Sequence, residues 1–353
     1  MAKNWARDTG SDGASQAPWW RPDRHADRRP FLAARARIRA RVRAWFEAEG
    51  FTEVETALLQ ASPCAETHLH GFATERVFPD GRREMRYLPT SPEFSAKKLL
   101  AAGETRIFEL ARAFRNREAG PLHAAEFTML EWYRAQAPYE AVIADTLALI
   151  AAAAPRLVWR GHEAETGRDP VRLTLPEAFR AVAGMDLLAS VGGHGETDRD
   201  GFAAAAAKAG VALAGDDSWS DVFTRVMAER VEPALDPTRL TILYEYPAPE
   251  AALARRAPHE PRVAERFELY ACGVELANGF GELTDAAEQR LRYEAAMDEK
   301  ERLYGERYPV DEDFLAALAL MPPASGVALG FDRLVMLASG ATRIEQVLWT
   351  PPL

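Results

Sequence analysis

The sequence is poor in cysteine, has no long apolar run and carries no surplus of basic residues. Cys64 and Cys272 are its two cysteines. They are too few for a disulfide framework, and no CxxC or Cys/His cluster predicts a zinc site. No stretch approaches the roughly 18 apolar residues of a membrane span, and no early segment has the layout of a signal peptide. These absences predict a cytoplasmic protein that does not bind a membrane.

The charge balance argues against a broad nucleic-acid-binding face. The formal net charge is -10 and the pI is near 5.4, whereas such a face is normally basic. The exception is a run of arginines at alternate positions from Arg35 to Arg43. We interpret this run as the solvated face of a helix, with a local basic patch as the alternative.

The composition is that of a globular protein with a large core. The 353 residues are 48% hydrophobic and 27% charged. Residues 1–25 begin with a stretch rich in Gly, Ser, Asp and Ala that lacks apolar periodicity, so we expect a mobile N-terminal tail. Residues 26–353 are then expected to form one catalytic-sized domain.

Apolar periodicity predicts a mixture of helices and strands without regular βαβ alternation. A helix is predicted over 31–48, because Ile38, Val42, Trp45 and Phe46 share one helical face, and a strand follows over 51–59. Further strand patterns occur in MRYLPTS, TRIFELARAFR and EFTMLEWY, with a helix in SPEFSAKKLLAAG between the first two. The fold class is therefore α+β.

The second half of the chain begins with an alanine-rich segment over about 140–240, interpreted as a mostly helical insertion. Strand patterns return in TRLTILYEYP and RFELYACGVELANGF. A charged helix is predicted over 285–304, and a last strand ends at Gly330 and leads into a helix.

Carboxylates occur at strand positions where a packed core alone would not require them. Phe127, Met129, Glu131 and Tyr133 share one strand face because side chains alternate with a period of two. The alternative is an amphipathic strand with Glu131 in solvent, but its neighbours on that face are apolar and aromatic.

A second group of carboxylates flanks a predicted hairpin turn at Ala271-Cys272-Gly273. This turn would bring Glu268 and Glu275 close together, which is costly unless a cation lies between them. Two such oxygen ligands suit Mg²⁺ bound jointly with substrate phosphates. The alternative, a pair of exposed hairpin acids, remains open for this segment alone.

The order of these segments resembles the signature motifs of class II aminoacyl-tRNA synthetases of the lysyl subgroup. Residues 34–56 are similar to motif 1, which in that family forms a helix and strand at a dimer interface. FRNREAGPLHAAEFTMLEWY resembles motif 2, and RFELYACGVELANGFGEL with SGVALGFDR resembles motif 3. The resemblance implies an antiparallel sheet flanked by helices, a homodimer and activation of a lysine-like amino acid by ATP.

The resemblance also implies roles for individual residues. Arg115 and Arg333 would be catalytic, with Arg115 on the α-phosphate and Arg333 and Phe127 enclosing the adenine. The residues implied to bind ATP are Arg115, Glu118, His123, Phe127, Glu268, Glu275 and Arg333, with Glu268 and Glu275 binding Mg²⁺. The residues implied to bind the amino acid are Glu93, Glu131, Tyr133, Asn278, Phe280, Glu282 and Ala328.

Only about thirty residues precede the motif 1 segment, which leaves no room for the anticodon-binding domain of a lysyl-tRNA synthetase. The sequence therefore resembles the truncated paralogues of these synthetases, the elongation factor P lysine ligases. That resemblance implies elongation factor P as acceptor and makes tRNA binding unexpected. It leaves α-lysine and β-lysine both open, with Ala328 favouring β-lysine. A truncated synthetase that charges tRNA or another carrier, and a non-catalytic regulator, are the alternatives.

Four positions depart from the family pattern. Ala57 stands where motif 1 usually has proline, and Arg117 stands where motif 2 usually has glutamate, with Glu118 one place on. Ala124 and Ala125 replace the asparagine and proline of the HNPEF segment. We expect these changes to alter the handling of ATP and to loosen the motif 2 loop, in a divergent ligase rather than an inactive one.

Overall fold

The computed structural model describes residues 18–193 and 195–351. Its first element is α1 (Pro22–Ala48), whose apolar side chains Leu32, Ile38, Val42 and Phe46 are buried on one side. Residues 22–25 therefore belong to a helix and not to the tail predicted for 1–25, because Pro22 at the first helical position favours helix initiation. The rest of that predicted tail, up to residue 17, lies outside the described residues.

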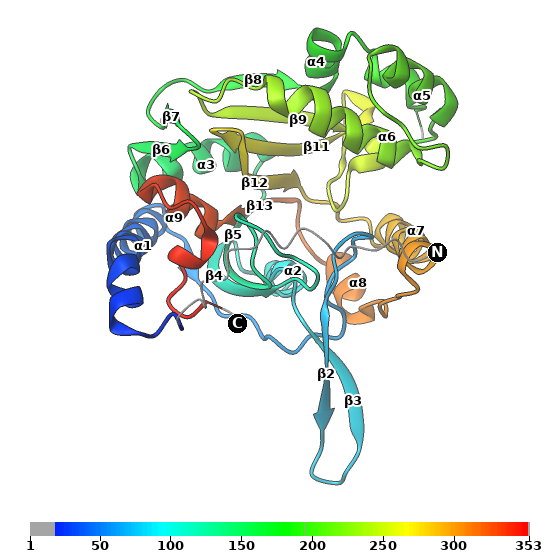
Figure 1. Cartoon of the computed structure of the whole chain (residues 1–353). Coiled ribbons are helices and arrows are strands. Elements are labelled where there is room, and N and C mark those ends of the chain that lie inside the picture. Colours follow the sequence, from blue (N-terminus) through cyan, green and yellow to red (C-terminus); the bar gives the residue numbers. More distant parts are fainter. Residues whose placement is uncertain (1–17, 194, 352–353) are drawn as a thin grey trace.

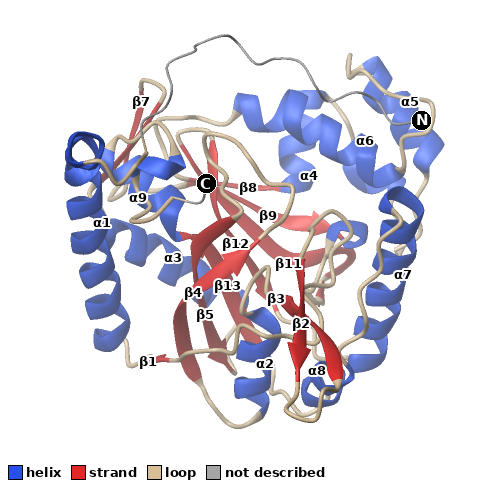
Figure 2. Cartoon of the chain, turned by 60° about the horizontal axis from the view of Figure 1, so that its bottom comes forward, coloured by secondary structure: helices blue, strands red, loops and turns tan. Residues whose placement is uncertain are grey.

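A central sheet organises the molecule (Figures 1 and 2). Its strands are β1 (Thr52–Glu53), β4 (Arg106–Phe114), β5 (Glu126–Ala135), β13 (Ala324–Gly330), β12 (Val274–Gly281), β11 (Glu260–Ala271), β9 (Thr241–Pro247) and β8 (Val171–Thr174), in that spatial order. A short strand, β10 (Arg256–Ala257), also pairs with β11. The pairings from β4 to β9 are antiparallel, and those at the two ends, β1–β4 and β8–β9, are parallel. The α+β class and the antiparallel sheet are confirmed.

The predicted elements are largely present, with different lengths. The strand expected over 51–59 is reduced to β1, because only Thr52 and Glu53 pair with β4. The predicted helices correspond to α2 (Glu93–Ala101), α7 (Ala286–Tyr304) and α9 (Phe331–Ser339), and α8 (Glu312–Leu318) lies between the last two. Asp285 caps α7 by accepting the backbone N–H groups of Ala287 and Glu288.

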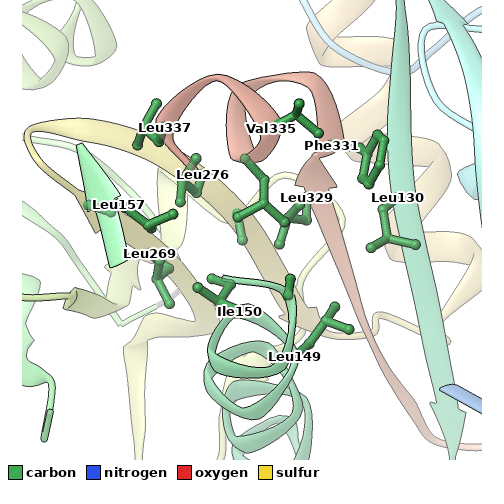
Figure 3. Packing of buried hydrophobic residues seen from close by; sticks show 14 of the residues in the cluster. Leu130, Leu149, Ile150, Leu157, Leu269, Leu276, Leu329, Phe331, Val335 and Leu337 are labelled. Carbon is green, nitrogen blue, oxygen red and sulfur yellow. The ribbon is translucent and has the colours of Figure 1, made fainter. Parts of the chain in front are cut away.

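One face of the sheet packs on helices. The core there combines α1, α3 (Tyr139–Ala153) and α9 with apolar residues of the central strands. Figure 3 shows Leu329 of β13 between Leu149 and Ile150 of α3 and Val335 of α9. The opposite face of the same strands carries the polar residues that the motifs predict, so the alternation along each strand separates core from site.

The segment between residues 140 and 240 holds more than helices. Besides α3 it contains β6 (Arg156–Trp159), β7 (His162–Glu165) and β8, followed by α4 (Leu175–Ala178), α5 (Arg199–Lys208) and α6 (Trp219–Val226). The helices α4 to α6 build a second core that rests on Leu243, Tyr246 and Tyr270 of the sheet. They lie together at one end of the sheet in Figure 1. The division of the chain at residues 140 and 240 stays a prediction.

A two-stranded hairpin extends from the body. Its strands β2 (Phe72–Val77) and β3 (Arg83–Leu88) pair with each other, and Figure 1 shows their turn far from the central sheet. Within the described residues, no helix is long and apolar enough to cross a membrane.

Candidate active site

A cavity of about 300 Å³ opens on the polar face of the central sheet. It gathers residues from α2, β5, β11, β12, β13 and α9, which are far apart in sequence. The predicted site residues that line it are Glu93, Arg115, Glu118, His123, Phe127, Glu131, Glu268, Glu275, Asn278, Phe280, Ala328 and Arg333. Tyr133 and Glu282 line an adjoining recess with Glu93, Glu131 and Asn278. The structure thus brings every predicted site residue to one place, while the role of each remains a prediction.

The hairpin of β4 and β5 supplies one wall. Arg115 follows β4 directly, and its guanidinium carbon lies 5.3 Å from the centre of the Phe127 ring on β5. Arg115 also donates from Nε to the carbonyl of Thr90 at 3.4 Å. These contacts hold a cation over an aromatic face at the edge of the cavity.

A β-bulge in β12 sets the direction of the residues on the opposite wall. Tyr270 pairs with Glu275 and Leu269 pairs with Ala277, so Leu276 has no partner across the β11–β12 ladder. In a regular strand Glu275 and Asn278 would point to opposite faces, because they are an odd number of residues apart. The extra residue restores the same face for both and turns Glu275 towards the cavity.

Arg333 lies in the first turn of α9, at the end of the cavity that Glu275 borders. Its guanidinium donates to the carbonyl of Glu275 at 3.0 Å and to Nε2 of His123 at 2.8 Å. Because arginine can only donate, His123 accepts at Nε2 and is neutral. Burial and the nearby Arg333 both lower the pKa of His123. Glu118 lies 3.6 Å from the same imidazole, which places a carboxylate beside this end of the cavity.

The other end of the cavity is rich in carboxyl groups. Tyr133 donates to Glu131 at 2.9 Å, and both side chains are buried. Burial, together with the neighbouring Glu93, raises the pKa of Glu131 well above its usual value. Burial also raises the pKa of Glu282 to about 7, although Lys97 opposes that shift. Glu93, Glu131 and Glu282 therefore converge at this end of the cavity. A bound cation would stabilise their charged forms, which burial deprives of contact with water.

Glu268 and Glu275 form the candidate metal site. Glu268 is buried and accepts from Arg266 and from the Tyr270 hydroxyl, each at 2.7 Å. Burial and then the charge of Glu268 raise the pKa of Glu275 to about 7. Two electrostatically coupled carboxylates fit a divalent cation, since it would relieve their repulsion and leave coordination positions for phosphate oxygens.

Two cations at the site, the buried Lys97 and the partly buried Arg266, were not identified from the sequence. Lys97 donates to Glu93 at 2.6 Å, and Arg266 pairs with Glu268 at 2.7 Å. The sequence could have indicated both contacts. Lys97 follows Glu93 by four residues on a predicted helix, and Arg266 precedes Glu268 by two residues on a predicted strand, so each cation lies on the same face as its glutamate. Glu66, in the loop before β2, also lines the cavity and gave no such signal.

Several alternatives from the sequence are now decided. Glu131 is 2% exposed, so a solvent-facing position for it is wrong. The arginine run is largely a solvated face, except that Arg35 is buried.

Arg117, the clearest departure from the family pattern, points away from the cavity. It forms an ion pair with Glu306, and its guanidinium carbon lies 5.9 Å from the centre of the Tyr304 ring. Its backbone φ of 63° is left-handed, an uncommon conformation for a side chain other than glycine. Glu118, the next residue, lines the cavity instead.

The antiparallel sheet, with an arginine on the motif 2 hairpin and another at the start of the last helix, defines a class II synthetase-type catalytic domain. The family model for class II tRNA synthetases (D, K and N) matches residues 18–352. The chain therefore belongs to the class II tRNA synthetase family.

Similar proteins narrow this assignment within the family. The elongation factor P–(R)-β-lysine ligase of Haemophilus influenzae (strain PittGG) is 39% identical over 319 residues, which is 90% of this chain and 93% of that protein. The enzyme of the same name from Klebsiella pneumoniae (strain 342) is 38% identical over 338 residues, 95% and 98% of the two chains. That from Proteus mirabilis (strain HI4320) is 37% identical over 324 residues, 91% and 94%. Within its family the chain belongs with this group of ligases.

Proposed function

We propose that the chain uses ATP to activate lysine or (R)-β-lysine as an aminoacyl-adenylate and transfers it to a lysine side chain of elongation factor P. The observation that carries this proposal is the polarity of the cavity. Arg115 and Arg333 border it at one end, and Glu93, Glu131 and Glu282 converge at the other. A triphosphate and a cationic amino acid need opposite charges, and one cavity offers both.

The activation step requires no nucleophile from the protein. The carboxylate of the amino acid attacks the α-phosphorus, an oxygen–phosphorus bond forms, and the bond to pyrophosphate breaks. Arg115 and Arg333 stabilise the negative charge that develops on the phosphate oxygens, while the glutamates hold the substrate ammonium. In the second step the acceptor amine attacks the carbonyl carbon, AMP leaves, and the amine loses a proton.

Mg²⁺ is the cofactor that this chemistry would use, and Glu268 and Glu275 are the residues that would hold it. When bound, it would neutralise charge on the ATP phosphates. Arg266 and Tyr270 keep Glu268 oriented towards the cavity, because each donates to one of its oxygens.

The proposal is tested by amino-acid-dependent exchange between ATP and pyrophosphate, with lysine, both enantiomers of β-lysine and the other standard amino acids. We expect exchange with lysine or (R)-β-lysine only, reduced about 10²- to 10³-fold by Arg115→Ala. Arg112→Ala is the matched control, because Arg112 lies exposed on β4, just before Arg115, and pairs with Glu126. Exchange with neither substrate would favour the non-catalytic regulator.

The acceptor is identified by the intact mass of elongation factor P after incubation with the enzyme, ATP and the activated amino acid. An increase equal to one aminoacyl residue supports the proposal, with modification localised to a lysine by peptide mapping. Transfer that ribonuclease abolishes would instead favour a truncated synthetase acting on tRNA. An unchanged mass together with active exchange would point to another carrier protein.

The proposed enzyme is a cytoplasmic homodimer. Support for the dimer comes from the resemblance of residues 34–56, in α1 and just after it, to motif 1, which lies at a dimer interface in that family. Light scattering at micromolar concentration checks the assembly, and a monomeric mass near 39 kDa would contradict it.

A further inference from the structure

Lys97 is a fully buried cation that contacts two of the carboxylates at the glutamate-rich end of the cavity. Its side chain is 1% exposed, and its Nζ lies 2.6 Å from an oxygen of Glu93 and 2.6 Å from Oε2 of Glu282. Glu93 and Lys97 share α2, whereas Glu282 follows β12. Lys97 therefore bridges two carboxylates that come from different elements, both of which line the amino-acid recess.

The charges around this bridge come from every element that packs there. Glu131 and Tyr133 face it from β5, and Glu109 lies opposite Glu131 on β4. Arg255 acts on Glu282 from the neighbouring segment, but its guanidinium is already paired with Glu265. The three carboxylates that line the recess, together with the Lys97 ammonium that contacts two of them, carry a net charge of −2 when all are ionised. Lysine and β-lysine each carry two ammonium groups, and these two positive charges would balance the net charge of −2.

We propose that Lys97 is a positioning residue that determines substrate specificity, because it fixes the carboxylates of Glu93 and Glu282 in place for a diamino substrate and supplies their counter-charge. The proposal rests on the proposed function of the site. The buried carboxylate of Glu282 would take up a proton more readily without a counter-ion, since burial and the nearby charge of Glu93 both favour the neutral acid. The recess would then have lost anionic charge before the substrate arrived. Lys97 supplies a counter-charge before the substrate arrives, so Glu282 keeps its negative charge to a lower pH than it would without Lys97.

The alternative is that Lys97 only fastens α2 to the sheet. Both roles predict a loss of stability on substitution, so stability alone does not separate them. The pH dependence of substrate binding does, because the positioning role acts through the ionisation of Glu282. Burial raises the pKa of Glu282 to about 7 and Lys97 lowers it. Removing Lys97 must therefore move this ionisation to higher pH.

The experiment measures binding of lysine and (R)-β-lysine by calorimetry from pH 6 to pH 9, and their KM and kcat in the exchange assay. In the wild-type chain, affinity falls as the pH drops through about 7. For Lys97→Met we expect the midpoint to rise by about one pH unit or more, and KM at pH 7 to rise about tenfold. The kcat at saturating amino acid should change by less than about threefold, because the reacting groups lie at the other end of the cavity.

The matched control is Lys98→Met. Lys98 is the next residue on α2 and also meets two carboxylates, Asp311 at 3.0 Å and Asp313 at 2.8 Å. Those carboxylates do not line the cavity, so the midpoint of binding should not move in this variant. Loss of thermal stability in both lysine variants, with a shifted midpoint in Lys97→Met alone, is the result that supports the proposal.

If Lys97→Met does not fold, Glu93→Gln decides the question with the opposite sign. Lys97 would then compensate Glu282 alone, and the midpoint should move to lower pH. An unmoved midpoint in the folded Lys97→Met variant, or in Glu93→Gln when Lys97→Met does not fold, would overturn the role of Lys97. A wild-type chain that binds neither amino acid at any pH would instead refute the proposed function.

Discussion

Arg35 in α1 forms a buried ion pair with Asp332 in the first turn of α9. The two side chains also meet the strand between them: Asp332 accepts the backbone N–H of Thr128 at 2.7 Å, and Arg35 donates to the Thr128 hydroxyl at 2.8 Å. One charged contact thus connects the three segments that resemble motifs 1, 2 and 3. It lies directly beside Arg333, whose position depends on the first turn of α9.

Replacing Asp332 by alanine should destabilise the fold strongly. Arg35 is 4% exposed and would be left as a buried charge without its carboxylate. We expect the free energy of unfolding to fall by about 3–5 kcal/mol, measured by chemical denaturation. Asp23→Ala is the control, because Asp23 pairs with Arg21 on the surface and should cost at most about 1 kcal/mol. An equal decrease in the free energy of unfolding in the two variants would show that the buried ion pair stabilises the fold no more than the surface pair does.

Glu118, not residue 117, should affect the use of ATP. Glu118 lines the cavity beside His123, whereas Arg117 pairs with Glu306 outside it. We expect Glu118→Ala to raise the KM for ATP about tenfold, the effect of losing one charged hydrogen bond of about 1.5 kcal/mol. Arg117→Ala should change it less than about threefold. The opposite ranking in the exchange assay would mean that Arg117 turns into the cavity when ATP binds.

Gly326 keeps the amino-acid recess open. A Cβ at this position would overlap the Tyr133 ring and the Glu282 carboxylate. Gly326→Ala must therefore displace one of these two groups, and we expect the KM for the amino acid to rise at least about tenfold. Gly167→Ala is the control, because nothing lies within 4 Å of a Cβ there. An unchanged KM in Gly326→Ala would show that the recess adapts without loss.

Glu131 should make the fold less stable as the pH rises. Its pKa is raised above 4.5 in the folded chain by burial and by Glu93. Above pH 4.5 the folded chain therefore holds more protons than the unfolded chain, and the free energy of unfolding falls with rising pH. Glu131→Gln removes this titration, so its Tm should exceed that of the wild type at pH 8 and approach it near pH 5.

Thermal unfolding at several pH values checks this prediction, with Glu126→Gln as control. Glu126 begins the same strand but its side chain is 47% exposed, so its Tm difference should not grow with pH. A Tm of Glu131→Gln that stays below the wild type at every pH would show that the buried carboxylate stabilises the fold. The same variant should bind lysine and (R)-β-lysine more weakly, since it removes one of the three carboxyl groups that line the recess.

The sequence by itself determined the elements with strong periodicity and the composition of the site. A strand with alternating apolar and polar residues buries one face whatever its neighbours are, so β5 and the side on which Glu131 lies could be predicted. The helices α2 and α7 followed from local patterns in the same way. Identification of the family then assigned the cavity residues, because the motifs place them on elements with a known arrangement.

Only the tertiary structure decided which groups meet across distant elements. The contact of Lys97 with Glu282 joins α2 to the end of β12, and the pair of Arg35 and Asp332 joins the first helix to the last. The bulge at Leu276 depends on pairing with β11, so a period of two along β12 alone could not place Glu275 and Asn278 on one face. The side taken by Arg117 depends on Glu306, far away in the sequence. Local patterns fix the faces of single elements, whereas charges that come from separate elements are paired only when the chain is packed.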